Sequence, residues 1–201
     1  MELLVTLGRT LGFSMAAGVN LYATVGILGL ASRYGWVSLP DQFKVFDHDA
    51  VIYSALALFV IEFVADKIPW IDTLWDSVHT AIRPLGGALI AVSTLGEASP
   101  ALQGLVALLG GGLAASSHLT KAGTRVTVNA SPEPFSNWIL SLSEDAFVFV
   151  LAGLALKFPL LALAVVVIAF VVCLAVLAYV VGTLRRVFAR RRQAFFGEQP
   201  A

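Results

Sequence analysis

Charged residues and cysteines are both scarce in this sequence. Only 13% of its 201 residues are charged and 58% are apolar, with a mean hydropathy of +0.86. Soluble domains carry about 25% charged residues, so the composition excludes an ordinary water-soluble enzyme, a disordered protein and a nucleic-acid-binding module. The single cysteine, Cys173, excludes an internal disulfide and a cysteine-based metal cluster. The net charge of zero means that no overall field attracts a charged partner.

Motifs of known catalytic sites are also missing. The sequence has no H-E-x-x-H, no phosphate-binding glycine loop and no G-x-S-x-G. We therefore expect no enzymatic activity and no cofactor. A membrane-embedded enzyme that lacks these motifs stays an alternative, as does a scaffold.

Long apolar stretches fill most of the chain. A membrane-spanning helix needs about 20 apolar residues, so the composition accommodates about six. We predict an all-α polytopic membrane protein with about six transmembrane helices, some of them glycine-rich and tilted or broken. The apolar segments cover residues 3–31, 50–65, 85–95, 101–118, 135–156 and 159–182. Glu2 and Arg9 argue against a signal peptide, and the first segment either tilts strongly or breaks near residues 18–20.

The chain ends in a basic tail. Five arginines in RRVFARRR follow the last apolar segment, and the positive-inside rule places them in the cytoplasm. We therefore divide the chain into one transmembrane domain, residues 1–184, and a cytoplasmic tail, residues 185–201. With six spans, both termini are cytoplasmic and the protein is a multi-pass protein of the inner (cytoplasmic) membrane.

A weak internal repeat relates the two halves of the chain. A shift of 98 positions aligns Gly12 with Gly110 and Asn20 with His118, and a shorter shift aligns Glu62 with Glu144. Three spans in each half would give the halves opposite orientations, as in many transporters. We predict an inverted repeat of residues 3–96 and 101–182. Chance is the alternative, because leucine, glycine and alanine are abundant.

Residues 70–83 have the pattern of an amphipathic helix that Pro69 begins and Pro84 ends. Its polar stripe consists of Asp72, Asp76, His79 and Arg83. Two interpretations remain open: an interfacial helix with a solvated polar stripe, or a helix that folds over a polar cavity. Asp76 and His79 also have the spacing of a metal-binding pair, but a second copy of the pair is missing, so a metal site stays unknown.

Several acidic residues lie inside apolar segments, where a charge costs about 2.5–3.5 kcal/mol to insert. Glu144 and Asp145 lie near the middle of the fifth segment, and Glu62 and Asp66 are one turn apart in the second. They are typical either of a cation or proton site or of buried ion pairs. The candidate basic partners are Arg9, Lys121 and Arg125.

If residues 118–125 are helical, His118, Lys121 and Arg125 share one face. They either bind an anion such as a phosphate or a lipid headgroup, or neutralise the carboxylates of Glu144 and Asp145.

Two stretches carry a family resemblance. EFVADKIPWIDTLWDSVHTAIRPLGG, residues 62–87, and AGVNLY, residues 17–22, resemble the domain of unknown function 4126 family of bacterial integral membrane proteins. The resemblance implies a multi-span protein of a bacterial membrane and supplies no function. Because this signature is centred on charged residues, the resemblance gives a polar cavity beside residues 70–83 the same weight as the interfacial alternative.

The sequence favours a transporter or channel for a small solute, ion or proton, with a polar site where two inverted halves meet. The alternative is a lipid-handling protein in which Arg83, Lys121 and Arg125 hold an anionic headgroup. Membrane lipids are expected partners, nucleic acid is not, and a homo-oligomer is possible. The candidate binding residues are Asn20, Tyr22, Glu62, Asp66, Asp76, His79, His118, Lys121, Arg125, Glu144 and Asp145.

Overall fold

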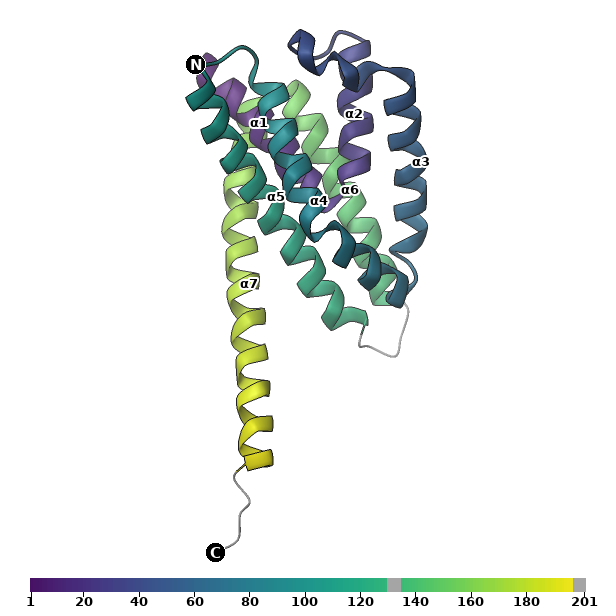
Figure 1. Cartoon of the computed structure of the whole chain (residues 1–201), viewed down its shortest axis with the longest axis vertical. Coiled ribbons are helices and arrows are strands. Elements are labelled where there is room, and N and C mark those ends of the chain that lie inside the picture. Colours follow the sequence, from purple (N-terminus) through teal and green to yellow (C-terminus); the bar gives the residue numbers. More distant parts are fainter. Residues whose placement is uncertain (130–134, 197–201) are drawn as a thin grey trace, which may run out of the picture.

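The computed structural model describes residues 1–129 and 135–196, and every regular element in these ranges is a helix. The predicted all-α fold is therefore confirmed, and Figure 1 shows the helices as one bundle from which the end of the last helix projects. The elements are α1 (Glu2–Val19), α2 (Leu21–Arg33), the 3-10 helix η1 (Asp41–Asp47), α3 (Asp49–Ala65), α4 (Pro69–Leu95), α5 (Pro100–Asn129), α6 (Phe135–Lys157) and α7 (Pro159–Phe196). Residues 197–201 of the predicted tail lie outside the described residues.

The first apolar segment is broken at Asn20. This residue has extended backbone angles, φ −144° and ψ 101°, between α1 and α2. Its side-chain oxygen accepts a hydrogen bond of 2.9 Å from the backbone N–H of Ala23, which caps the start of α2. Of the two alternatives for the first segment, a strong tilt or a break near residues 18–20, the structure has the break.

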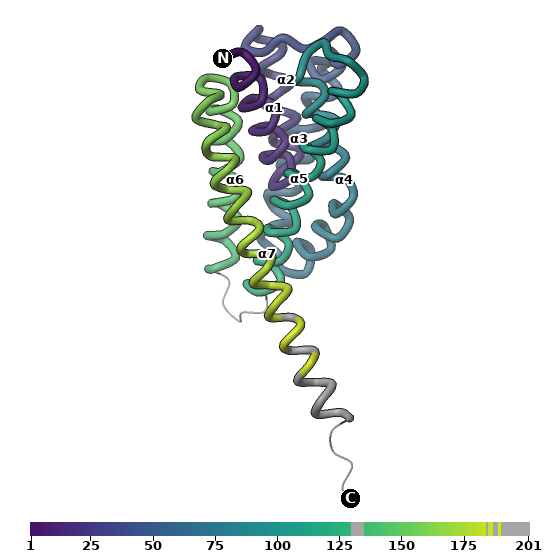
Figure 2. The backbone as a smooth tube through the Cα atoms, turned by 90° about the vertical axis from the view of Figure 1, so that its left-hand side faces the viewer, coloured from purple at the N-terminus to yellow at the C-terminus, as the bar shows by residue number. Residues whose placement is uncertain are grey.

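The beginning of α1 and the end of α2 lie at the same end of the bundle (Figure 1). The Oγ1 atoms of Thr10 in α1 and Thr94 near the end of α4 lie 3.4 Å apart. Gly29 in α2 packs against Ile52 in the first turn of α3, and η1 shares a pocket with the α4–α5 connection. Figure 2 shows the same arrangement from the side. α1 and α2 therefore form a re-entrant pair that enters the bundle and returns.

Four helices, α4 to α7, are long and apolar enough to cross a membrane, and a fifth span results if η1 and α3 are counted together. These five helices run from one end of the bundle to the other, whereas α1 and α2 do not (Figure 1). Such helices are compatible with a multi-pass membrane protein. The beginning of α1 and the end of α7 lie at opposite ends (Figure 1). This does not agree with six spans and two cytoplasmic termini, because the first segment turns back.

Two helices are longer than the sequence predicts. α4 continues through Pro84, which we expected to end it, so residues 70–83 and 85–95 form one helix. Neighbouring helices allow a proline inside a buried helix, and α4 packs closely on α5 here. α5 continues to Asn129, well past residue 118, where the predicted apolar segment ends. Its polar residues Lys121 and Arg125 are buried in the bundle.

Small residues bring α4 and α5 together. A Cβ atom on Gly110 would overlap the Cβ of Ala91, and one on Gly87 would overlap the Cβ of Ala114. The hydroxyl of Ser14 in α1 also donates to the carbonyl of Gly87 over 3.1 Å. Without side chains at these glycines, three helix backbones approach one another closely.

The predicted inverted repeat is not seen in the helix directions. Ser14 packs beside Gly110, and four residues later Gly18 packs against Ser117. Residue numbers thus rise together in α1 and α5, so these helices are parallel. A two-fold axis in the membrane plane would make them antiparallel. The first half also contains the re-entrant pair, for which α5 has no matching break.

The packing predicts opposite effects for two neighbouring glycines of α5. Gly110→Ala adds a methyl group where Ala91 leaves no room, and overpacking typically costs about 1–3 kcal/mol. Gly112→Ala adds the same group into open space and removes a poor helix former, a gain of up to about 1 kcal/mol. Thermal unfolding in detergent should show a lower midpoint for the first variant and an equal or higher one for the second. Equal midpoints would contradict the close packing.

The re-entrant pair predicts which residues share a side of the membrane. In a Cys173→Ala background, Glu2→Cys and Gln42→Cys should react with an impermeant maleimide from one side. Glu2 begins α1, and Gln42 in η1 shares a pocket with the α4–α5 connection, at the same end of the bundle as the N-terminus (Figure 1). A tag after residue 201 should be reached from the other side. If the two cysteines react from opposite sides, the first segment crosses the membrane and the six-span topology is right.

Candidate functional site

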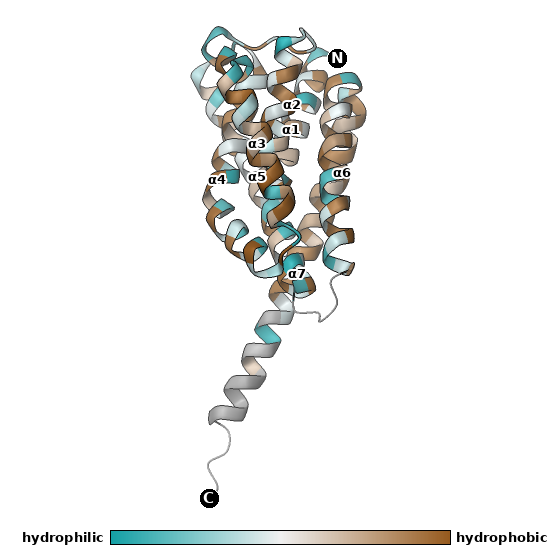
Figure 3. Ribbon diagram, turned by 90° about the vertical axis from the view of Figure 1, so that its right-hand side faces the viewer, coloured by the Kyte–Doolittle hydropathy of each residue, from teal (hydrophilic) through white to brown (hydrophobic). Residues whose placement is uncertain are grey.

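α4 has its polar face turned inward. Asp72 and Arg83 are 0% exposed, whereas Leu74 is 60% and Val78 57% exposed. Figure 3 shows this mixture of polar and apolar residues along α4. An interfacial helix would place its polar stripe in water, so that interpretation is wrong. The helix instead covers a polar interior, as the second interpretation proposed.

Arg83 joins α3, α4 and the end of α1. Its guanidinium forms an ion pair with Glu62 of α3 and lies 3.3 Å from Asp76. One of its nitrogens also donates to the carbonyl of Gly18 over 3.3 Å and to Nδ1 of His118 over 2.9 Å. The side chains of Arg83 and Glu62 are both completely buried. His118 accepts at Nδ1 and is therefore unprotonated on that atom.

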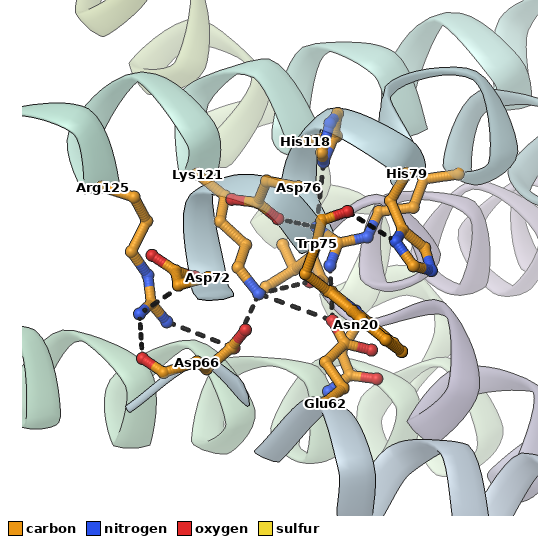
Figure 4. Close-up of polar contacts among 12 residues, drawn as sticks. Asn20, Glu62, Asp66, Asp72, Trp75, Asp76, His79, His118, Lys121 and Arg125 are labelled. Carbon is orange, nitrogen blue, oxygen red and sulfur yellow. Dashed lines mark hydrogen bonds and ion pairs between the residues drawn. The ribbon is translucent and has the colours of Figure 1, made fainter. Parts of the chain in front are cut away.

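The buried charged side chains contact one another, and we call them the ionic network. Lys121 lies at its centre (Figure 4). Its ammonium lies 2.8 Å from a carboxylate oxygen of Asp66, 3.5 Å from Glu62 and 3.7 Å from Glu144. It also donates to the carbonyl of Val19, the last residue of α1, over 3.4 Å. Glu62 and Glu144 therefore meet in the interior through one cation.

Arg125 lies one turn further along α5. Its guanidinium donates to both carboxylate oxygens of Glu144, and it lies 3.2 Å from Asp66 and 3.4 Å from Asp72. It also donates to the side-chain oxygen of Asn137 over 2.9 Å. Asp66 follows the last residue of α3. Burial alone would raise its pKa, but Lys121 and Arg125 together hold the pKa of this carboxyl below its ordinary value.

His79 is tied to the re-entrant pair. Its Nδ1 lies 2.7 Å from the carbonyl of Trp75 and must donate to it, which leaves Nε2 to accept from the hydroxyl of Tyr22 over 2.8 Å in the neutral ring. Both nitrogens are thus engaged. No group of three or more possible metal ligands occurs in the described ranges, so the spacing of Asp76 and His79 receives no support as a metal site.

Asp145 differs from the other carboxylates. Asn20, at the break between α1 and α2, donates to one of its oxygens over 3.2 Å. Its second oxygen is buried and has no hydrogen-bond partner in the part of the chain that the structure describes. Among residues 1–129 and 135–196, Asp145 forms no ion pair, and neither does Arg9, which was one of its candidate partners.

Acidic groups outnumber basic groups in this network. Arg83, Lys121 and Arg125 are its buried cations, and Lys67 is a half-buried fourth at the edge. The carboxyl groups are those of Glu62, Asp66, Asp72, Asp76, Glu144 and Asp145. Six acids thus face four bases. Within the described ranges, hydrogen-bond partners are missing for oxygens of Glu62, Asp66, Asp72, Asp76 and Asp145.

All candidate residues named from the sequence lie in this network or touch it. The candidate list omits Asp72, Arg83 and Asn137. The first two share a helical face with Asp76 and His79, and that spacing was sufficient to include them. Asn137 had no such signal, because it reaches Arg125 only through the packing of α6 on α5.

The ion pair between Arg125 and Glu144 predicts a loss of stability in Glu144→Gln. The neutral amide leaves a buried guanidinium without its bidentate partner, and breaking a buried pair typically costs about 3–5 kcal/mol. The exposed Glu97 offers the matched control Glu97→Gln, which should behave as the wild type. Denaturant unfolding in detergent measures both. Equal stability of the two variants would contradict a structural role for this pair.

Comparison with known proteins yields one family. No curated protein and no solved structure matches the chain. A model of the family described as "Domain of unknown function (DUF4126)" matches residues 7–179, which include every residue of the network. The match also covers the two stretches that carry the resemblance seen in the sequence. The chain therefore belongs to the DUF4126 family.

Proposed function

We propose that the protein is a small transporter or channel of the inner (cytoplasmic) membrane and that it moves a small solute or ion through the buried network. The observation that supports this proposal most strongly is the excess of carboxyl groups over basic groups in the interior. This excess favours a proton or a small cation as the species that moves.

The physical reason is the free energy of a buried charge. An ionised carboxylate away from water is strongly unfavourable unless a counter-charge or hydrogen bonds compensate it. Here six acids share four basic groups, so the network needs protons or an added cation to become neutral. Carboxylates that lie close together also bind protons one after another, as a coupled group. Such a group takes up and releases a cation when its surroundings change.

The helix break supports the same proposal. Broken helices at membrane depth occur where protein or a cavity covers the freed backbone groups, and transporters use them to form ion sites. In this chain the carbonyls of Gly18 and Val19, at the end of α1, face Arg83 and Lys121. Asn20 at the break donates to Asp145, which forms no ion pair within the described part of the chain. The break and this carboxylate are therefore in direct contact.

The lipid-handling alternative receives less support. Arg83, Lys121 and Arg125 are at most 4% exposed and are held by carboxylates. An anionic headgroup would have to displace these acids. The proposal includes no enzymatic reaction and no cofactor, and its basis for this is the set of catalytic motifs that the sequence lacks.

The proposal predicts that Asp145→Asn lowers flux without unfolding the protein. Asparagine keeps the shape of the side chain and a hydrogen bond to Asn20, but it no longer binds a proton or attracts a cation. In liposomes that contain only this protein, proton flux measured with an enclosed pH-sensitive dye, or flux of a monovalent cation, should fall about tenfold, equivalent to about 1.4 kcal/mol. The unfolding midpoint should stay within the range of the wild type, because no ion pair is lost.

Asp41→Asn is the matched control, since Asp41 is exposed in η1 and pairs with Lys44 outside the network. It should leave flux unchanged. The transport proposal is wrong if the wild-type protein conducts neither protons nor monovalent cations, or if Asp145→Asn and Asp41→Asn conduct equally well.

A further inference from the structure

A pocket of about 260 Å³ lies between α1, α5, α6 and α7, beside the ionic network. We call it the lateral pocket. Most of its wall is apolar and comes from Met15, Val19, Leu140, Phe147, Ala169 and Cys173. Apolar walls do not replace the hydration shell of a small inorganic ion. The wall therefore suits the hydrocarbon part of a ligand.

One side of the lateral pocket is polar. Lys121 and Glu144 contribute to it together with the hydroxyl groups of Ser117, Thr120, Thr124 and Ser143. The side chain of Glu144 is 12% exposed, whereas the other carboxylates in ion pairs with Arg83, Lys121 or Arg125 are at most 5% exposed. Glu144 is thus the acid of these pairs that a ligand in the pocket reaches most easily.

The polar side accepts hydrogen bonds but has few to donate. Each of the four hydroxyl groups donates to a main-chain carbonyl, over 2.8–3.0 Å. Their lone pairs remain as acceptors. The ammonium of Lys121 is already surrounded by three carboxylates and a carbonyl. A ligand head that donates hydrogen bonds and carries positive charge therefore matches this side, and a carboxylate or phosphate head does not.

We propose that the lateral pocket binds an amphiphilic cation, with a primary ammonium head at Glu144 and an aliphatic tail along α7. The volume of about 260 Å³ holds roughly nine water-sized groups at about 30 Å³ each. A primary amine with an eight-carbon chain has this size. Binding here does not require the network to conduct, so the site goes beyond the proposed transport function.

The single cysteine of the chain provides the measurement. Cys173 lines the lateral pocket, so a bound ligand should shield its thiol from a membrane-permeant maleimide. The wild-type protein in detergent is alkylated with N-ethylmaleimide, and the rate is followed by mass spectrometry. n-Octylammonium should slow alkylation about tenfold when it is about tenfold above its dissociation constant. n-Octanoate, with a tail of equal length and the opposite charge, should change the rate by less than about twofold.

Two alanine variants test the position of the site. Ala169→Phe fills the lateral pocket and should remove the difference between the two probes. Ala175→Phe is the matched control, because Ala175 is exposed on α7 outside the pocket. The Ala175→Phe variant should keep the difference in alkylation rate between the two probes. If Ala169→Phe does not fold, the comparison of the two probes on the wild-type protein still tests the binding proposal.

Three results would overturn the proposal: equal shielding by both probes, no shielding by either, or a Cys173 that the maleimide does not reach at all. Asp145→Asn separates this proposal from the transport function. It should lose flux and keep the shielding by n-octylammonium, because Asp145 does not line the lateral pocket. Shielding without flux in the wild type would leave the binding site intact and remove the transport proposal alone.

Discussion

The ammonium of Lys121 is the interaction on which the rest of the structure depends. It lies in α5 and contacts acids of α3, of the segment after α3 and of α6, together with the last carbonyl of α1. A buried ammonium without such partners would be prohibitively unfavourable. The need of this ammonium for charged and polar partners therefore fixes the relative positions of four parts of the chain. Two further cations bind carboxylates in the same way. They are Arg83 in α4 and Arg125, which lies one turn beyond Lys121 in α5.

The re-entrant pair is possible only because side chains satisfy the backbone at its tip. A helix that ends inside a membrane leaves carbonyl groups without partners. In this chain Arg83 and Lys121 donate to Gly18 and Val19, and the side chain of Asn20 caps α2. The positive charges at the end of α1 also agree with the direction of its helix dipole. The ionic network and the broken helix are thus two parts of one arrangement.

Local features could be predicted from the sequence, and features that depend on several helices could not. The break at Asn20 and the polar face of α4 followed from glycine content and helical spacing. The sequence did not predict that α2 returns to the end of the bundle where α1 begins, because hydropathy does not show in which direction a helix runs. Pro84 misled the prediction because the packing of α4 on α5 outweighs its effect. The ion pair of Glu62 with Arg83 could not be predicted either, since it depends on how α3 lies against α4.

The network is hard to explain as a device for stability. A buried ion pair is often no more stabilising than well-packed apolar residues of similar volume, because desolvation offsets the attraction. A chain that is 58% apolar has many such residues available. It nevertheless places six acids and four bases in one network, three of the bases buried and Lys67 at the edge. A purely structural network would also balance its charges, whereas this one retains an acidic excess next to a broken helix. The imbalance therefore supports the proposed role, in which protons or cations enter and leave the interior.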